Sequence, residues 1–258
     1  MFGGSLLRIY LAGDVAVEHG EHLLRDADLA GRQGRLALVY LVAERERAVT
    51  QSELAELLWP ESLPPSWPVA LSAVISKLRQ KLGAIGLDRD RIIANAFRCY
   101  QFRPAGETWI DLEAAADALH LAEGAVIAKH PEGAYGPALI ATTIARRPFL
   151  VGEDAPWVTN RRERLRDLLV RALDCRVEAL LWNGELALAQ DQARAAVDLE
   201  PYRESGYRRL MQVLVRRGDR AEAVRVYQQC RQRLADELGV GPSDETEALL
   251  KTLLGSTA

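Results

Sequence analysis

Basic side chains gather in one short window of an amino-terminal region that is otherwise acidic. Residues 1–113 hold 13 Lys and Arg against 15 Asp and Glu, a net charge of −2. Within them, residues 77–103 hold seven basic side chains against two acidic ones, a net charge of +5. Clustered Lys and Arg neutralise phosphates and release the counterions that condense on nucleic acids. The window therefore indicates a phosphate-binding surface, with a solvated basic face as the alternative.

Polar side chains on and after a predicted helix over 67–82 are the candidate contacts. Leu71, Ile75, Leu78 and Leu82 recur at i, i+4, i+7 and i+11, which predicts one buried stripe. Lysine, arginine and glutamine side chains off that stripe can reach phosphates or base edges, and serine hydroxyls can donate to phosphate. The expected DNA contacts are Ser72, Ser76, Lys77, Arg79 and Gln80 on the helix, and Arg98 at the tip of the hairpin that follows.

No pattern in the chain supports catalysis, a metal ion or a cofactor. The sequence contains no HExxH, no GxSxG and no glycine-rich phosphate loop. Its cysteines form no CxxC pair, and His19 and His22 stand three residues apart in a predicted turn region. Glu153 and Asp154 precede Ala-Pro-Trp in a predicted loop, where acids are usually solvated. We therefore expect no catalytic residues, no metal site, no cofactor and no enzymatic activity.

The elements that position the candidate contacts follow from periodicity and capping residues. Thr50 and Glu53 form a predicted capping box at the start of a short helix. Ser66 is the expected N-cap of the next helix, and Gly83 is its expected C′ residue. Asn95 is the expected turn residue of a hairpin. The expected order is short strands within 6–24, helices over 32–46, 51–59 and 67–82, and a β-hairpin over 91–102.

Residues 177–242 repeat with a period of 34 residues. Gly184 and Gly218 are one period apart, as are Ala189 and Ala223. A 34-residue period with a turn glycine and small residues on the second helix is typical of the tetratricopeptide repeat, and an ordinary helical bundle is the alternative. Repeats of this kind present a groove to a partner. We expect helix throughout 161–254, with breaks near 183–185, 200–203, 217–219 and 239–243.

The composition fits a protein with a sizeable core. The chain has 258 residues, is 48% hydrophobic and carries a net charge of −3. No apolar run approaches the roughly 18 residues of a membrane span, and the start lacks the order of a signal peptide, so we expect a cytoplasmic protein. Trp59, Trp157 and Trp182 stand in apolar contexts and are expected in the core. Asp111 is expected to cap the first helix after a domain junction.

Several segments resemble known families of regulators. LAELLWP at 54–60, VISKLRQKLG at 74–83 and CYQF at 99–102 resemble a winged helix-turn-helix of the OmpR/PhoB type, although Phe97 and Cys99 stand where that type usually has glycines. WIDLEAAADAL at 109–119, RPFLVGEDAPWV at 147–158 and the residues from 161 to 254 resemble the bacterial transcriptional activator domain. Together they are similar to the layout of the Streptomyces antibiotic regulatory protein family.

This resemblance implies a mainly α protein with a small β portion. A winged helix-turn-helix over 1–106 would precede an all-α, tetratricopeptide-like domain over 107–258. The family resemblance implies a transcriptional activator that binds promoter DNA, contacts RNA polymerase and self-associates on DNA at direct repeats. The alternative is an adaptor that has lost DNA binding and works by protein contacts alone. The apolar start of the helix over 67–82 and the missing wing glycines favour this alternative.

Overall fold

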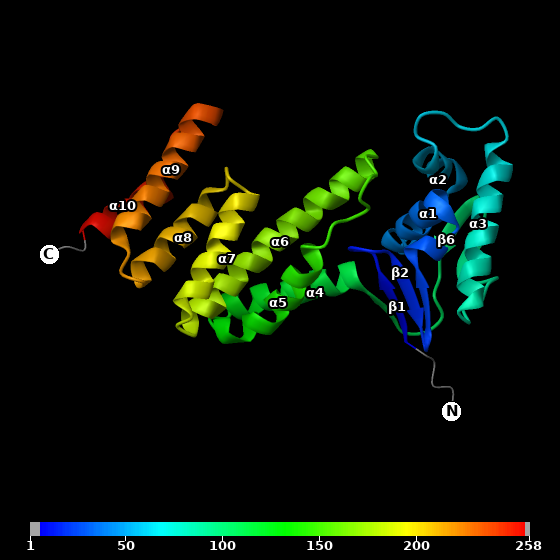
Figure 1. The fold of residues 1–258 in the computed structure, drawn as a ribbon, viewed down its shortest axis with the longest axis horizontal. Coiled ribbons are helices and arrows are strands. Elements are labelled where there is room, and N and C mark those ends of the chain that lie inside the picture. The colour runs from blue at the N-terminus through cyan, green and yellow to red at the C-terminus, as the bar shows by residue number, and fades with distance from the viewer. Residues whose placement is uncertain (1–5, 256–258) are drawn as a thin grey trace. The chain divides into compact units, whose positions relative to one another are not determined.

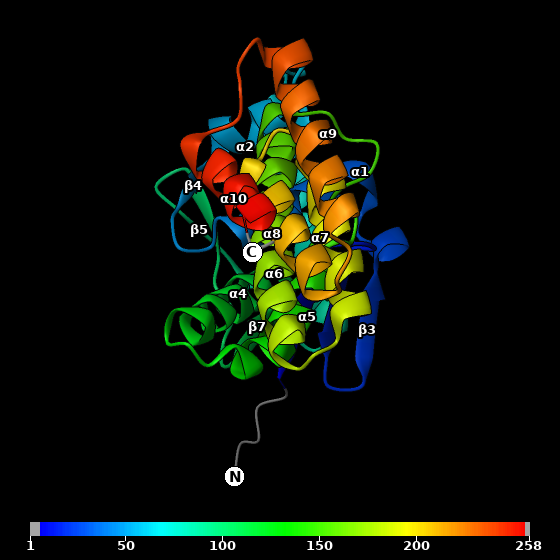
Figure 2. The same ribbon diagram turned by 90° about the vertical axis from the view of Figure 1, so that its left-hand side faces the viewer.

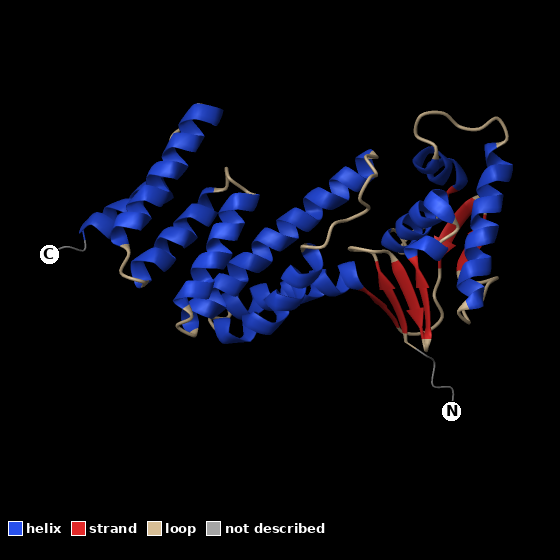
Figure 3. Ribbon diagram, in the orientation of Figure 1, coloured by secondary structure: helices blue, strands red, loops and turns tan. Residues whose placement is uncertain are grey.

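The computed structural model describes residues 6–255 and divides the chain into two compact units. Unit 1 comprises Met1–Ala114 and Arg147–Arg162, and unit 2 comprises Ala115–Arg146 and Glu163–Ala258. All strands of the described residues belong to unit 1, and helices form most of the rest (Figure 3). The fold class is the expected one, mainly α with a small β portion. The domain ranges 1–106 and 107–258 stay a prediction, from which these contact units differ chiefly at residues 147–162.

A four-stranded sheet opens unit 1. Its strand order is β3-β2-β1-β7, antiparallel except for β7, which pairs parallel to β1. Asp111 follows β7 directly, is fully buried, and accepts hydrogen bonds from the N–H groups of Leu11 and Ala12, each at 2.9 Å. Burial raises the pKa of Asp111 above its usual range. The carboxylate therefore joins the end of β7 to the residues that follow β1. It also accepts a hydrogen bond from the N–H of Leu112 at 2.8 Å. The strands are β1 (Leu7–Tyr10), β2 (Ala16–His19), β3 (His22–Arg25) and β7 (Thr108–Ile110).

Three helices and a second sheet complete the winged helix of unit 1. The helices pack on one another, and α1 also packs against β6, the central strand of the sheet β4-β6-β5 (Figure 1). Buried leucines and valines of α1, together with Ala37, fill the space between them. The helices are α1 (Gly31–Ala43), α2 (Gln51–Leu58) and α3 (Trp67–Ala84), and the strands are β4 (Val49–Thr50), β5 (Ile93–Ala96) and β6 (Cys99–Phe102).

The predicted helix caps of unit 1 form only in part. Thr50 accepts from Glu53 N–H at 3.1 Å, but the Glu53 carboxylate binds side chains elsewhere, so half of the capping box is present. Ser66 occupies the N-cap position of α3 without a side-chain cap bond. Gly83 lies inside the last turn of α3, and Gly86 takes the left-handed conformation, with φ of +84°. The predicted C′ role of Gly83 is therefore wrong.

Residues 147–162 pack into unit 1 through polar and aromatic contacts. Glu153 is 3% exposed and binds Arg32 at 2.6 Å and Arg35 at 3.0 Å, so the prediction of a solvated acid is wrong there. Only its neighbour Asp154 is solvated, with 98% of its side chain exposed. Trp157 contacts the ring of Tyr40 edge-on at 5.1 Å between centroids, in keeping with its predicted anchoring role. These contacts hold the segment against α1.

Unit 2 is a series of helices whose breaks fall where the sequence predicts them. No strand interrupts residues 161–254, and the gaps between helices fall at 183–185, 200–203, 217–219 and 239–243. The helices α7, α8 and α9 lie side by side (Figure 1), and Figure 2 views the same helices with α9 and α10 toward the reader. The helices α4 and α6 begin in unit 1 and continue into unit 2. The helices are α4 (Asp111–Ile127), α5 (Tyr135–Ala145), α6 (Pro156–Trp182), α7 (Leu186–Leu199), α8 (Glu204–Arg216), α9 (Arg220–Leu238) and α10 (Asp244–Gly255).

The 34-residue repeat is visible in the backbone of the two turns. Gly184 and Gly218 have φ of +77° and +87°, as helix-ending glycines require. The N–H of Glu185 donates to the carbonyl of Leu180, and the N–H of Asp219 donates to the carbonyl of Leu214, each at 2.9 Å. Both bonds span five residues and close the end of the preceding helix. Ala189 and Ala223 are fully buried, which confirms the predicted close helix contacts.

One aromatic prediction fails in unit 2. Trp182, the last residue of α6, is 63% exposed rather than buried in the core. The 34-residue-related position at the end of α8 is Arg216, so the repeat itself does not require an apolar side chain there. Among residues 6–255, no helix is long and apolar enough to cross a membrane.

Candidate nucleic-acid interface

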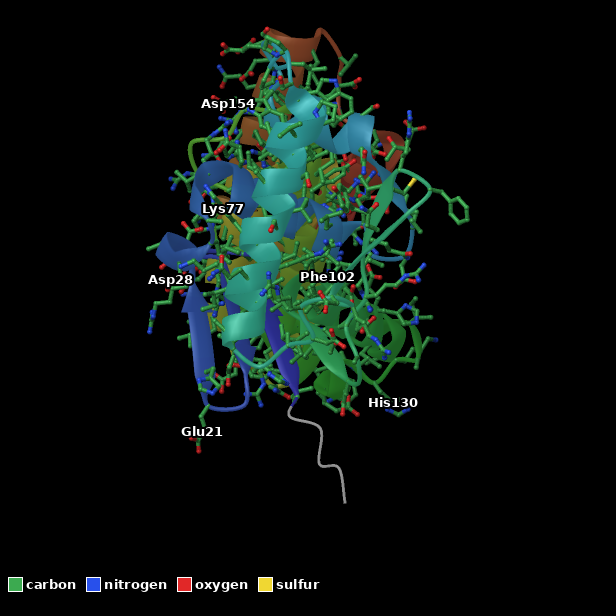
Figure 4. The ribbon with its side chains drawn as sticks, turned by 90° about the vertical axis from the view of Figure 1, so that its right-hand side faces the viewer. Glu21, Asp28, Lys77, Phe102, His130 and Asp154 are labelled. Carbon is green, nitrogen blue, oxygen red and sulfur yellow. The ribbon has the colours of Figure 1, made fainter. Side chains whose placement is uncertain are left out.

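Helix α3 presents one stripe to the core and another to solvent. Its core stripe is buried as predicted, with Leu71, Ile75, Leu78 and Leu82 at 0–1% exposure. The exposed positions recur at i, i+3, i+4, i+7, i+8 and i+11, which is the opposite face of the same helix. Figure 4 views α3 from this side, with Lys77 labelled near the middle of the helix. We call this face the outer stripe; it consists of Val69, Ser72, Ala73, Ser76, Lys77 and Gln80.

The outer stripe brings together four of the six expected contacts. Ser72, Ser76, Lys77 and Gln80 are all exposed on it, within three turns of helix. The fifth, Arg98, is exposed in the turn of the β5–β6 hairpin. The sixth, Arg79, is only partly exposed and points off the stripe toward the same hairpin. Contacts of all six with DNA remain predictions.

Arg79 connects α3 to the hairpin. Its Nε and Nη2 both donate to the carbonyl oxygen of Ile93, the first residue of β5, at 3.1 and 2.5 Å. A guanidinium has five N–H donors, so three remain for another acceptor. Tyr100 on the neighbouring strand β6 pairs with Asn95 and is buried, and burial raises the pKa of its phenol. Arg79 therefore fixes the position of the hairpin relative to the outer stripe.

The turn between β5 and β6 is a two-residue turn of unusual composition. Ala96 pairs with Cys99, which leaves Phe97 and Arg98 as the turn. Their φ values are +51° and +59°, the left-handed conformation that two-residue hairpin turns of this type require at both positions. Asn95, the residue we expected in the turn, lies within β5 instead. We call Phe97 and Arg98 the wing turn.

The wing turn is held by the start of α2 and projects its side chains outward. The N–H of Gln51, the first residue of α2, donates to the carbonyl of Arg98 at 2.9 Å. Phe97 is 100% exposed. Sequence reasoning noted Phe97 only as a departure from the usual glycine and did not include it among the candidate contacts. The signal was a bulky apolar residue at a position where the backbone favours glycine.

A cluster of polar side chains fixes α2 to the end of α1. The Tyr40 hydroxyl donates to Glu53 at 2.6 Å, and two nitrogens of Arg47 donate to the same carboxylate at 2.5 and 3.0 Å. The guanidinium of Arg47 beside Glu53 holds the pKa of that carboxyl below its usual range. Burial and the neighbouring Glu53 raise the pKa of Tyr40 to about 12. The cluster keeps the helices that support α3 and the wing turn in place.

Two of the exposed positive charges of the basic window lie on the outer stripe and in the wing turn, at Lys77 and Arg98. Arg91 pairs with Asp88 at 3.5 Å, and Arg103 donates to Gln101 at 2.9 Å. Across the part of the chain that the structure describes, Lys77 and Arg98 form no ion pair with an acidic side chain. Their charges are therefore available to an anionic partner.

The histidines and acids of the described residues do not assemble into a metal site. Between residues 6 and 255, no three His, Cys, Asp or Glu side chains gather in a group that could hold a metal ion. Nδ1 of His19 donates to the carbonyl of Ile85 at 2.9 Å, which joins β2 to the end of α3. His22 is exposed at the start of β3.

Unit 2 has a polar groove along its repeated helices. The groove measures about 480 Å³ and is bordered by α7, α8 and α9. Tyr207 lies at its floor, donates to the carbonyl of Pro201 at 2.9 Å and accepts from Arg233 at 3.3 Å. Charges of both signs line the groove, which suits a polar peptide surface better than an apolar ligand. Its rim side chains include Arg194, Asp198, Gln229, Gln232 and Asp236.

Comparison with protein families matches residues 110–254 to the bacterial transcriptional activator domain. Among curated relatives, the regulatory protein AfsR of Streptomyces coelicolor is 30% identical over 229 residues, which are 86% of this chain and 22% of AfsR. AfsR of Streptomyces griseus is 28% identical over 96% of this chain. The transcriptional regulatory protein EmbR of Mycobacterium tuberculosis is 26% identical over 85% of this chain and 57% of EmbR. The chain thus spans about a quarter of AfsR and little more than half of EmbR.

Comparison with solved structures gives the same fold over nearly the whole chain. The structure of Mycobacterium tuberculosis EmbR in complex with a low-affinity phosphopeptide superposes with a TM-score of 0.87. The superposition covers 98% of this chain and 66% of the other, at 24% sequence identity. At that identity the likeness shows the fold, a winged helix followed by a helical repeat unit.

Proposed function

This chain belongs to the bacterial transcriptional activator domain family, that of the Streptomyces antibiotic regulatory proteins, and we propose that it activates transcription by binding promoter DNA through unit 1. The observation that carries the proposal is the outer stripe of α3. It puts an unpaired lysine and three hydrogen-bonding side chains on one exposed face, opposite a fully buried leucine stripe. An exposed helix of this kind fits the major groove, where base edges are read.

In this account the outer stripe and the wing turn contact DNA together. Lys77 and Arg98 neutralise phosphates, since neither is paired within the described residues. Ser72 and Ser76 donate to phosphate, and Gln80 is placed to read a base edge. Arg79 holds the hairpin at a fixed distance from α3 and keeps three donors for a nearby phosphate. A rigid pairing of helix and wing fixes the register on the duplex.

Unit 2 supplies the protein contacts in the proposed function. A solenoid of stacked helix pairs offers an extended surface to a partner. The polar groove along α7, α8 and α9 is the candidate surface for RNA polymerase. We further propose that copies associate on DNA at direct repeats, that the chain works in the cytoplasm and that it has no enzymatic activity.

The adaptor without DNA binding is the second candidate, and two exposed apolar side chains favour it. Val69 is 71% exposed at the start of the outer stripe, and Phe97 is fully exposed in the wing turn. Phosphate contacts need neither side chain. In the DNA-binding account Val69 instead meets the methyl group of a thymine, an apolar contact that the major groove provides.

The experiment that separates the two candidates is a fluorescence-anisotropy titration of the folded chain with labelled duplex. One duplex carries the promoter region upstream of the chain's own gene, and the other has random sequence. The DNA-binding proposal expects binding of both at low salt, tighter binding of the promoter duplex, and a steep loss of affinity as salt rises. The adaptor expects no measurable affinity for either duplex at low salt.

A further inference from the structure

Phe97 in the wing turn is an aromatic residue that the fold of this chain does not use. Its side chain is 100% exposed, more than any other large apolar side chain of the described residues. Burial therefore contributes nothing to folding at this position. Its φ of +51° lies in the left-handed region, which a bulky residue adopts only at a cost in free energy. Asn-Gly would make the same turn without that cost.

The turn that carries Phe97 is fixed on both sides. Gln51 N–H donates to the carbonyl of Arg98, and Arg79 donates twice to the carbonyl of Ile93 at the other end of β5. Backbone strain that the surrounding hydrogen bonds hold in place is found mostly at functional positions. The ring therefore projects from a rigid support rather than from a loose loop.

The charges around Phe97 indicate what covers it. Arg98 is the next residue, is exposed, and forms no ion pair within the described residues. Lys77 on the outer stripe is likewise unpaired, and Arg79 links the stripe to the same hairpin. A surface that receives Phe97 must accept an adjacent positive charge. Duplex DNA offers an apolar surface for the ring in its stacked base steps, and a negative charge for Arg98 in the phosphates beside them.

We propose that Phe97 is a wedge that enters the minor groove and inserts between two base pairs next to the site occupied by α3. This inference rests on the proposed DNA binding. Apolar wedges of this kind unstack one step and bend the duplex toward the major groove. Pyrimidine–purine steps such as TA and CA unstack most easily, so the wing selects such a step by its deformability rather than by a hydrogen bond. Arg98 then pairs with the phosphate beside the opened step.

The test is the substitution Phe97→Gly, which removes the wedge and suits the left-handed backbone. The probe is a duplex that the wild-type chain selects from a random-sequence pool, labelled at its ends with a donor and an acceptor dye. We expect affinity to weaken by about ten- to a hundredfold, the size of a lost aromatic contact to a base. We also expect the energy transfer that reports bending to fall to its value in free DNA. Thermal unfolding of unit 1 should not occur at a lower temperature.

Two further variants separate the wedge from simpler explanations. Phe97→Leu keeps an apolar wedge and should keep most of the bend. Arg98→Ala should reduce the slope of affinity against salt by about one unit, whereas Phe97→Gly should leave that slope unchanged. The wedge is overturned if Phe97→Gly binds as tightly as wild type, or if its complex bends the duplex as much. Failure of the wild-type chain to bind any duplex at low salt would instead overturn the proposed function.

Discussion

The turns of the helical repeats and the wing turn use the same backbone conformation with opposite residues. Gly184 and Gly218 end helices of unit 2 with φ of +77° and +87°. Phe97 and Arg98 turn the hairpin of unit 1 with φ of +51° and +59°. Glycine takes this conformation freely, whereas any residue with a Cβ pays for it. The chain thus follows the backbone rule where it builds the repeats and departs from it in the wing.

The turn residues of the repeats stabilise the fold, whereas the residues of the wing turn do not. In the repeats, turn glycines and fully buried alanines at matched positions support one arrangement of helices. In the wing turn, the left-handed backbone disfavours Phe97 and Arg98, and the exposed ring of Phe97 gains nothing from burial. Natural sequences depart from local rules mainly at functional sites. This departure supports the proposal that unit 1 binds DNA through the wing turn and the neighbouring outer stripe.

The largest effect should follow from a charge in the repeat core. Ala223 is fully buried in a cluster that includes Tyr207 and Met211. Ala223→Arg buries an unpaired charge at a close helix contact, which costs several kcal/mol, on the order of a domain's whole stability. Circular dichroism should show unit 2 unfolded at room temperature. Ala235→Arg, exposed on the same helix, is the matched control and should melt like wild type. Equal melting of both variants would contradict the repeat register.

A smaller loss should follow from removal of the one buried acid that joins residues 147–162 to α1. Glu153→Ala leaves Arg32 and Arg35 without their shared partner. Removing one partner of a fully buried pair costs about 3–5 kcal/mol, and because these arginines reach solvent we expect about 2 kcal/mol. Urea unfolding measures the change. Asp154→Ala removes a solvated acid from the next position and should cost nothing measurable. A loss equal in the two variants would argue against the assigned ion pairs.

Exchanging the residue types of the two turns tests the comparison itself. A Cβ at Gly184 meets no atom within 4 Å, so Gly184→Ala tests the backbone alone. It should destabilise unit 2 by about 1–2 kcal/mol, the cost of the left-handed conformation. Phe97→Gly should relieve the same strain, offset in part by the entropy of glycine, and stabilise unit 1 by up to about 1 kcal/mol. Opposite signs in thermal unfolding are the expected result. Destabilisation by both would mean that Phe97 contributes to folding after all.

The smallest expected effect concerns acid stability at α2. Arg47 lowers the folded pKa of Glu53 below the usual value of 4.5. A lowered carboxyl pKa contributes stability that is present above its usual value and is lost as pH falls through the folded value. Because Glu53 is one-third exposed, we expect less than about 1 kcal/mol. Unfolding of Glu53→Gln should depend less on acid pH than that of wild type. Glu56→Gln, exposed on the same helix, should retain the wild-type dependence.

Much of the fold follows from the sequence because its signals are local. The period of 34 residues, its turn glycines and Pro201 predict the helix breaks within residues 161–254, and the apolar stripe of α3 predicts its buried face. Strand β7 escapes prediction because it has three residues and pairs with β1, about one hundred residues earlier in the chain. The burial of Glu153 could not be predicted for a similar reason, because its partners Arg32 and Arg35 lie more than one hundred residues earlier in the chain.

The candidate site could be predicted in its helix but not in its hairpin. Spacing alone separates Ser72, Ser76, Lys77 and Gln80 from the buried stripe, so the outer stripe follows from periodicity. The turn could not be placed, because Asn95 suits a turn better than Phe97 does. The pairing of Ala96 with Cys99 moves the turn two residues onward. The hydrogen bonds from Arg79 to the carbonyl of Ile93 could not be predicted either, because they form only when the fold brings α3 beside β5.

DNA binding through the outer stripe of α3 is tested by the salt dependence of duplex binding, compared between wild type and Lys77→Ala. The account predicts that affinity for a random-sequence duplex falls steeply with salt, and that Lys77→Ala reduces the slope of log affinity against log salt by about one unit. Lys129→Ala removes a lysine that is also exposed, from unit 2, and should leave the slope unchanged. A wild-type chain that binds no duplex at low salt, or a slope that Lys77→Ala does not alter, would contradict DNA binding through the outer stripe of α3.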